Sequence, residues 1–113
     1  MEALKLARNI VTSLEDKKAE DIVLLDLQET APIGQFYVIC SANNERALRT
    51  LADATMRDLK GTVAKPNLEG TAREGWILAD FGSVLVHILS SQQRGYYQLE
   101  SLWDEAKVLL HMQ

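Results

Sequence analysis

Residues 76–89 read WILADFGSVLVHIL and contain two clear strand patterns. Two apolar runs flank Gly82-Ser83, and a glycine at the first central position of a two-residue loop suits a type II′ turn because glycine adopts positive φ without strain. The stretch is therefore predicted to form a β-hairpin. One surface of that hairpin is entirely apolar and pairs Phe81 with Val84, Ala79 with Val86 and Ile77 with Ile88. The other pairs Trp76 with Leu89, Leu78 with His87 and Asp80 with Leu85. This register also predicts that Trp76, Asp80 and His87 share a mixed surface. A different turn would exchange the two faces of the hairpin.

The chain before the hairpin alternates helical and strand patterns. Apolar residues recur at helical spacing over 4–14 and again over 48–59, where Asn43 or Asn44 can cap the helix and Gly61 can end it. Between these helices, the apolar runs 21–27 and 36–41 are typical of inner strands. The weaker pattern over 62–75 leaves room for one short strand. We expect an α/β fold in which residues 1–113 form a single domain, with a small mixed sheet flanked by helices.

Composition places the chain among ordinary globular proteins and narrows its partners. It has 113 residues, a length that is enough for one hydrophobic core without disulfide bonds or structural metal ions. Of these residues, 47% are hydrophobic and 25% are charged. The formal net charge of −4 disfavours binding to nucleic acid by bulk phosphate neutralisation and suits a basic protein partner. No apolar run approaches a membrane span, and the first residues lack a signal-peptide pattern. We therefore expect a cytoplasmic protein.

Motifs for catalysis or metal binding are weak. Asp80-Phe81-Gly82 matches the magnesium-binding tripeptide of protein kinases, but the other kinase motifs are missing from this short chain. Neither His87 nor His111 has a second histidine or a cysteine at ligand spacing, and a lone strand histidine is more often structural. The only cysteine, Cys40, lies in an apolar strand pattern that predicts a buried side chain. The residues predict no enzyme, no metal site and no cofactor.

Aromatic residues gather near the end of the chain. Residues 94–104 read RGYYQLESLWD, which mostly has a helical pattern and holds three of the seven aromatic side chains (two Trp, three Tyr, two Phe). Tyr, Trp and Arg are the residue types that dominate protein–protein hot spots. The segment is therefore either a helix that clasps the core or a surface that docks another macromolecule.

Several of these segments together resemble the Iojap family, the bacterial ribosomal silencing factors. The matching stretches appear in the family's order over nearly the whole chain and comprise residues 20–27, 36–41, 44–46, 69–70, 76–87 and 94–103. The hairpin that runs from Trp76 to His87, together with the Tyr-Tyr-x-Leu-Glu-x-Leu-Trp segment at 96–103, is a specific signature. The chain is identified on these motifs as a member of that family.

The resemblance implies both a fold and a function. The fold would be distantly similar to nucleotidyltransferases but without their catalytic carboxylates. The function would be to bind the large ribosomal subunit through its fourteenth ribosomal protein, to block joining of the small subunit, and so to repress translation when nutrients are scarce. The docking surface carried over by position comprises Trp76, Asp80, His87, Arg94, Tyr96, Tyr97, Leu99, Glu100, Leu102 and Trp103.

The chain also departs from the family pattern at a few positions. Gly34-Gln35 replaces the usual Thr-Asp before the second strand, Ala42 replaces a usual glycine, and Gly95 stands where a charged residue is common.

Three alternative functions stay open: a residual nucleotidyltransferase or nuclease activity, a metabolite sensor that uses the Trp76–His87 surface, and a related role in ribosome assembly. An exposed aromatic patch could also pair two copies of the free protein as a homodimer.

Overall fold

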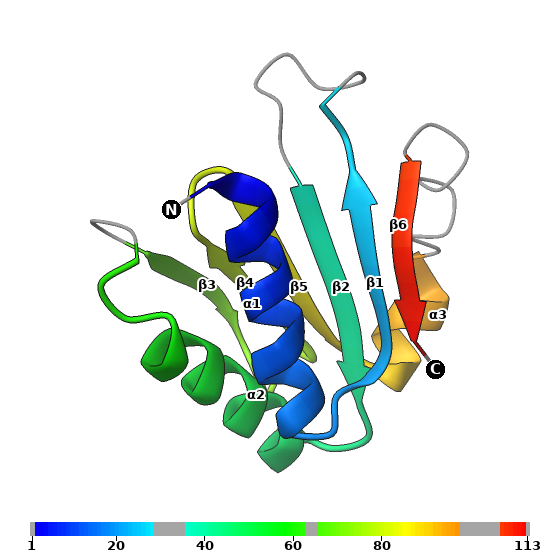
Figure 1. Ribbon diagram of the computed structural model, residues 1–113. Coiled ribbons are helices and arrows are strands. Elements are labelled where there is room, and N and C mark those ends of the chain that lie inside the picture. Colours follow the sequence, from blue (N-terminus) through cyan, green and yellow to red (C-terminus); the bar gives the residue numbers. More distant parts are fainter. Residues whose placement is uncertain (1, 29–35, 63–65, 98–106, 113) are drawn as a thin grey trace.

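The computed structural model describes residues 2–28, 36–62, 66–97 and 107–112. These residues form a mixed six-stranded sheet with flanking helices (Figure 1). In chain order, the elements are α1 Ala3–Asp16, β1 Glu20–Asp26, β2 Phe36–Ala42, α2 Glu45–Asp58, β3 Asn67–Thr71, β4 Trp76–Asp80, β5 Val84–Ser90, α3 Ser91–Tyr97 and β6 Lys107–Met112. The strand order is β3-β4-β5-β2-β1-β6, in which β2 and β5 are parallel and the other pairs are antiparallel. The predicted α/β fold with a small mixed sheet is confirmed.

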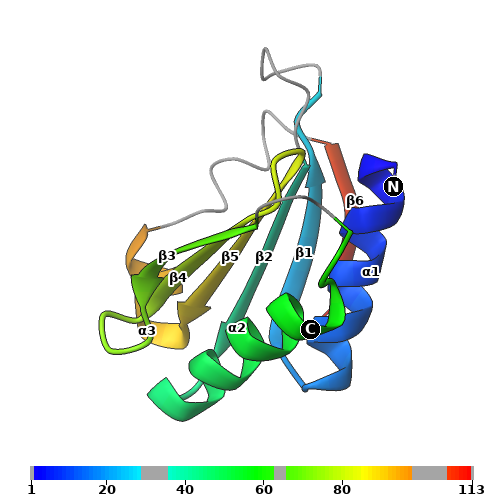
Figure 2. The same cartoon turned by 90° about the vertical axis from the view of Figure 1, so that its left-hand side faces the viewer.

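Helices α1 and α2 cover one face of the sheet, and α3 lies on the opposite side (Figure 2). Both long helices are amphipathic, so their apolar stripes meet the sheet while their charged residues stay in solvent. The buried helix side chains are Leu6, Ala7, Ile10, Val11, Ser13 and Leu14 on α1 and Leu48, Leu51, Ala52, Ala54 and Thr55 on α2. Asn44 is the cap of α2, and its side-chain oxygen accepts a hydrogen bond from the Ala47 N–H at 2.7 Å. From the sequence alone, either Asn43 or Asn44 could have been the cap of this helix.

The hairpin has the predicted register, with Ala79 opposite Val86 and Leu78 opposite His87. Its apolar surface lies in the core under the two long helices. The turn differs from the expected type II′ geometry. Gly82 has φ +82°, and the Ser83 N–H donates to the Phe81 carbonyl at 3.1 Å, which is the bond of a γ-turn centred on Gly82. The glycine is required in either case, because both turns need a positive φ at that position.

The sheet face opposite α1 and α2 has a second apolar cluster. Its fully buried members are Val23, Leu25, Ile39 and Leu89, with Tyr37 and Trp76 packed against them. Strand β1 therefore buries side chains on both faces, as its nearly continuous apolar run predicted. The candidate site lies on this second cluster.

Strand β6 was not anticipated from the sequence. It pairs with β1 in antiparallel register at the edge of the sheet, with a register shift between Leu24 and Leu25. A short run such as Val108-Leu109-Leu110 has no periodicity of its own that separates strand from helix, so the distant pairing with β1 decides its structure. Within the four described ranges, no helix is long and apolar enough to cross a membrane.

Candidate functional site

Three rings meet on the sheet face opposite α1 and α2: Tyr37 from β2, Trp76 from β4 and His87 from β5. We call them the aromatic trio. The ring centroids of Tyr37 and His87 are 5.0 Å apart, and those of Trp76 and His87 are 5.9 Å apart, both at tilted angles. The Trp76 indole Nε1–H donates a hydrogen bond to His87 Nδ1 at 3.3 Å. The trio therefore confirms that Trp76 and His87 share a surface.

His87 is neutral at physiological pH. Burial lowers its pKa from 6.5 to about 4, because desolvation penalises the charged imidazolium. Since Nδ1 accepts the bond from the indole, the ring proton of the neutral form lies on Nε2. Nε2 is buried and has no hydrogen-bond partner among the described residues. The histidine thus orients the indole of Trp76, a structural role that its isolation in the sequence favoured.

Two further residues of the predicted surface have local structural roles. The Asp80 carboxylate accepts a hydrogen bond from the Gly82 N–H at 2.8 Å, so it fixes the hairpin turn. Arg94, on α3, is only 5% exposed, and its guanidinium bonds the Asp21 carbonyl and lies 3.3 Å from the Asp21 carboxylate. Arg94 therefore points into the protein, where it can support the surface.

Asp21 joins three elements at one point. Its second carboxylate oxygen lies 2.6 Å from His111 Nε2 on β6, so α3, β1 and β6 meet there. Asp21 has φ +50°, and it lies where the pairing of β1 with β2 shifts by one residue. Sequence reasoning missed Asp21, His111 and Tyr37 as parts of the site. Only Tyr37 carried a usable signal, because strand alternation places it on the face of Ile39.

The remaining predicted residues are only partly covered by the structure. Tyr96 and Tyr97 are the last two residues of α3, and the structure describes only their backbone. Leu99, Glu100, Leu102 and Trp103, together with Gly34-Gln35, lie outside the described residues. Their assignment to the docking surface stays a prediction.

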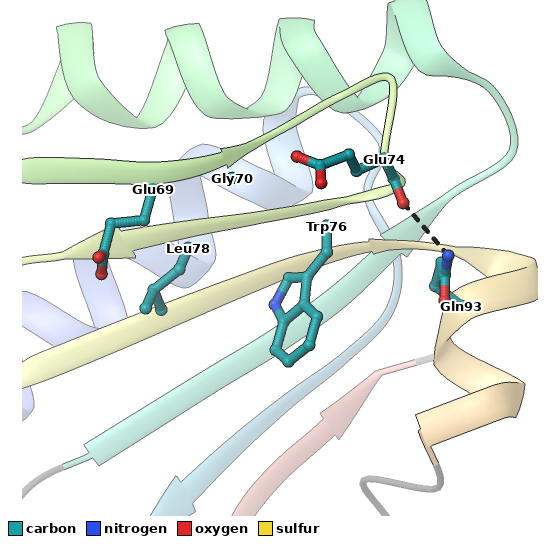
Figure 3. Close-up of a pocket in the computed structure, with 6 residues that line it drawn as sticks. All are labelled: Glu69, Gly70, Glu74, Trp76, Leu78 and Gln93. Carbon is teal, nitrogen blue, oxygen red and sulfur yellow. Dashed lines mark hydrogen bonds between the residues drawn. The ribbon is translucent and has the colours of Figure 1, made fainter.

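A pocket of about 580 Å³ opens beside the trio (Figure 3). The described residues that line it are Glu69, Gly70, Glu74, Trp76, Leu78 and Gln93. Glu69 and Leu78 are cross-strand neighbours on β3 and β4. Gln93 Nε2 donates to the Glu74 carbonyl at 3.2 Å, which ties the β3–β4 loop to α3. In the described ranges, the pocket included, no group of three His, Cys, Asp or Glu side chains gathers closely enough to hold a metal ion.

The Cys40 thiol is expected to be inert in the folded protein. It is fully buried, and desolvation raises its pKa from 9.0 to about 12. The reactive thiolate is therefore almost absent at pH 8, and we expect labelling by a thiol-specific disulfide reagent to be about a thousandfold slower than in the urea-unfolded chain. Rapid stoichiometric labelling of the native protein would contradict this account of Cys40.

Comparison with known proteins shows the family to which this chain is similar. Residues 1–113 match the family model described as "Ribosomal silencing factor during starvation". A ribosomal silencing factor of Halalkalibacterium halodurans is 37% identical over 107 residues, which cover 93% of this chain and 88% of the relative. One from Bacillus subtilis is 32% identical, with 91% and 86% covered. A crystal structure of a Chromobacterium violaceum protein superposes with a TM-score of 0.84 at 30% identity, covering 92% of this chain and 88% of that one. The chain belongs to the ribosomal silencing factor family.

Proposed function

We propose that this protein binds the large ribosomal subunit through its fourteenth ribosomal protein and sterically blocks joining of the small subunit. The observation that carries the proposal is the aromatic trio, held on a sheet face where apolar neighbours are also partly exposed. Family membership supports a role in translation regulation. Steric occlusion requires only that a folded domain occupies the position of the other subunit.

The trio has the chemistry and the rigidity of an interaction hot spot. Tyr37 and Trp76 are partly exposed, as are Leu78 and Leu85 on the same face. Aromatic side chains supply large contact areas with few rotatable bonds. Because the bond to His87 already fixes the indole of Trp76, docking would lose little side-chain entropy there. The net charge of −4 would favour encounter with a basic ribosomal protein.

The state of the candidate reactive groups supports a role without catalysis. Cys40 is buried and stays a thiol, so it offers no nucleophile. The Nδ1 atom of His87 is engaged by Trp76, and burial keeps the ring neutral. We therefore infer that the protein acts by binding alone.

Trp76→Ala is expected to weaken binding to the purified fourteenth ribosomal protein by about 2 kcal/mol, roughly a thirtyfold loss. The loss arises because the variant removes the largest aromatic ring of the trio. Isothermal titration calorimetry measures the affinity, and circular dichroism checks the fold. Arg49→Ala is the matched control, because Arg49 is exposed on α2, on the far side of the sheet. A folded Trp76→Ala variant with wild-type affinity would rule out docking through the trio.

A further inference from the structure

The pocket beside the trio combines an aromatic wall with negative charge. The side chains of Trp76 and Leu78 project to the same side of the sheet, and Glu69 lies next to Leu78 (Figure 3). Glu74 lines the same pocket from the loop between β3 and β4. No lysine or arginine is among the described lining residues. The pocket is therefore an apolar surface bordered by two carboxylates without cations of its own.

Both carboxylates have acceptor capacity that the fold does not use. Glu69 is exposed, and its carboxylate makes no hydrogen bond or ion pair within the part of the chain that the structure describes. Glu74 accepts a bond from the Thr71 hydroxyl at 2.9 Å through one oxygen, and no described residue bonds the other. A ligand with several N–H donors could bond these oxygens without displacing an internal partner.

We propose that this pocket receives an arginine side chain from the protein partner, a proposal whose choice of partner rests on the function proposed above. The flat guanidinium would lie against the indole of Trp76, and its N–H groups would bond the carboxylate of Glu69. Tryptophan is the best aromatic ring for such a cation–π contact. Arginine suits the site better than lysine because its planar fork can stack on a ring and bond a carboxylate at once. The two carboxylates repel phosphate, which argues against an RNA backbone as the occupant.

The pocket is held open by contacts on both of its sides. The Gln93 side chain bonds the Glu74 carbonyl, and the Gln93 N–H donates to the Ser90 hydroxyl at 3.0 Å. On the other side, Gly70 pairs with Ile77 and approaches the backbone of Trp76 closely. A cavity that is already shaped binds its occupant with a smaller ordering penalty.

Glu69→Gln tests the proposal against the purified fourteenth ribosomal protein by calorimetry. We expect the variant to lower the affinity about fivefold, because it removes the charged acceptor but keeps the shape. Glu15→Gln is the matched control: it removes the same charge from an exposed position at the end of α1, away from the pocket. Equal affinities of the two variants would overturn the proposal and leave the proposed partner in place.

If the wild-type chain does not bind that ribosomal protein, a small arginine derivative tests whether the pocket binds an arginine side chain. N-acetyl-arginine amide at millimolar concentration is expected to shift the Trp76 indole N–H resonance, which the variant Trp103→Phe assigns. N-acetyl-citrulline amide, which lacks the positive charge, should cause no shift, and Glu69→Gln should abolish the arginine effect. A shift with this pattern would support the arginine pocket and remove only the proposed partner. In the absence of partner binding, no shift would overturn the pocket as well.

Discussion

Lowering the pH from 7 to 4 is expected to reduce the free energy of unfolding by about 3 kcal/mol through His87 alone, given its shift in pKa from 6.5 to about 4. The folded state depresses this pKa, so the unfolded chain takes up the proton first as the pH falls. The stabilisation is complete above pH 6.5, the unfolded value, and is lost progressively toward the folded value of about 4. The physical cause is burial of the imidazole beside Trp76 and Tyr37, where a charged ring would be poorly solvated.

Urea unfolding of the wild type and of His87→Asn at pH 7 and pH 4 measures this contribution. The asparagine side chain keeps an acceptor close to the position of Nδ1 but does not titrate in this range. We expect the stability difference between the two proteins to change by about 3 kcal/mol over the interval, with the wild type losing more. Parallel pH profiles would show that His87 does not titrate as its burial predicts.

Gly70→Ala is expected to lower the free energy of unfolding by about 3 kcal/mol or more, because it combines a disfavoured backbone conformation with a steric clash. Gly70 has φ +79°, and a Cβ atom there would lie 2.2 Å from the carbonyl oxygen of Trp76. That oxygen belongs to the backbone of β4, so it cannot move without disturbing the pairing of β3 with β4. Thermal and urea denaturation measure the loss.

Gly61→Ala is the matched control for this prediction. Gly61 has a similar φ of +86°, but a Cβ atom there would meet nothing within 4 Å. This variant should therefore show only the conformational cost of about 1 kcal/mol. If both variants lose the same stability, close approach to Trp76 is not what requires glycine at position 70.

The hairpin could be predicted from sequence because its information is local. Strand residues alternate faces with a period of two, so the position of Gly82 sets which residues oppose one another on β4 and β5. The two long helices followed equally from their apolar spacing, and a cap for α2 was expected at Asn43 or Asn44. These signals identified Trp76 and His87 as neighbours without knowledge of the rest of the sheet.

The rest of the site depends on contacts between distant parts of the chain. Arg94 and Asp21 are 73 residues apart, and no periodic pattern predicts that an arginine next to an aromatic segment turns inward. Tyr37 joins the trio only because β2 and β5 pair in parallel. This pairing brings Ile39 opposite His87, and Tyr37 lies on the same face of β2 as Ile39. Strand β6 likewise depends on its pairing with β1. Local propensity contains no information about such pairings.

We propose that this protein prevents joining of the ribosomal subunits by occupying the large one. Sucrose-gradient sedimentation of purified small and large subunits, with and without the protein at fixed salt and magnesium, measures whether it does so. We expect the protein to sediment with the large subunit and the peak of joined ribosomes to disappear. Protein that stays at the top of the gradient while joining proceeds unchanged would contradict silencing by occlusion and favour a metabolite-sensing role for the Trp76–His87 surface.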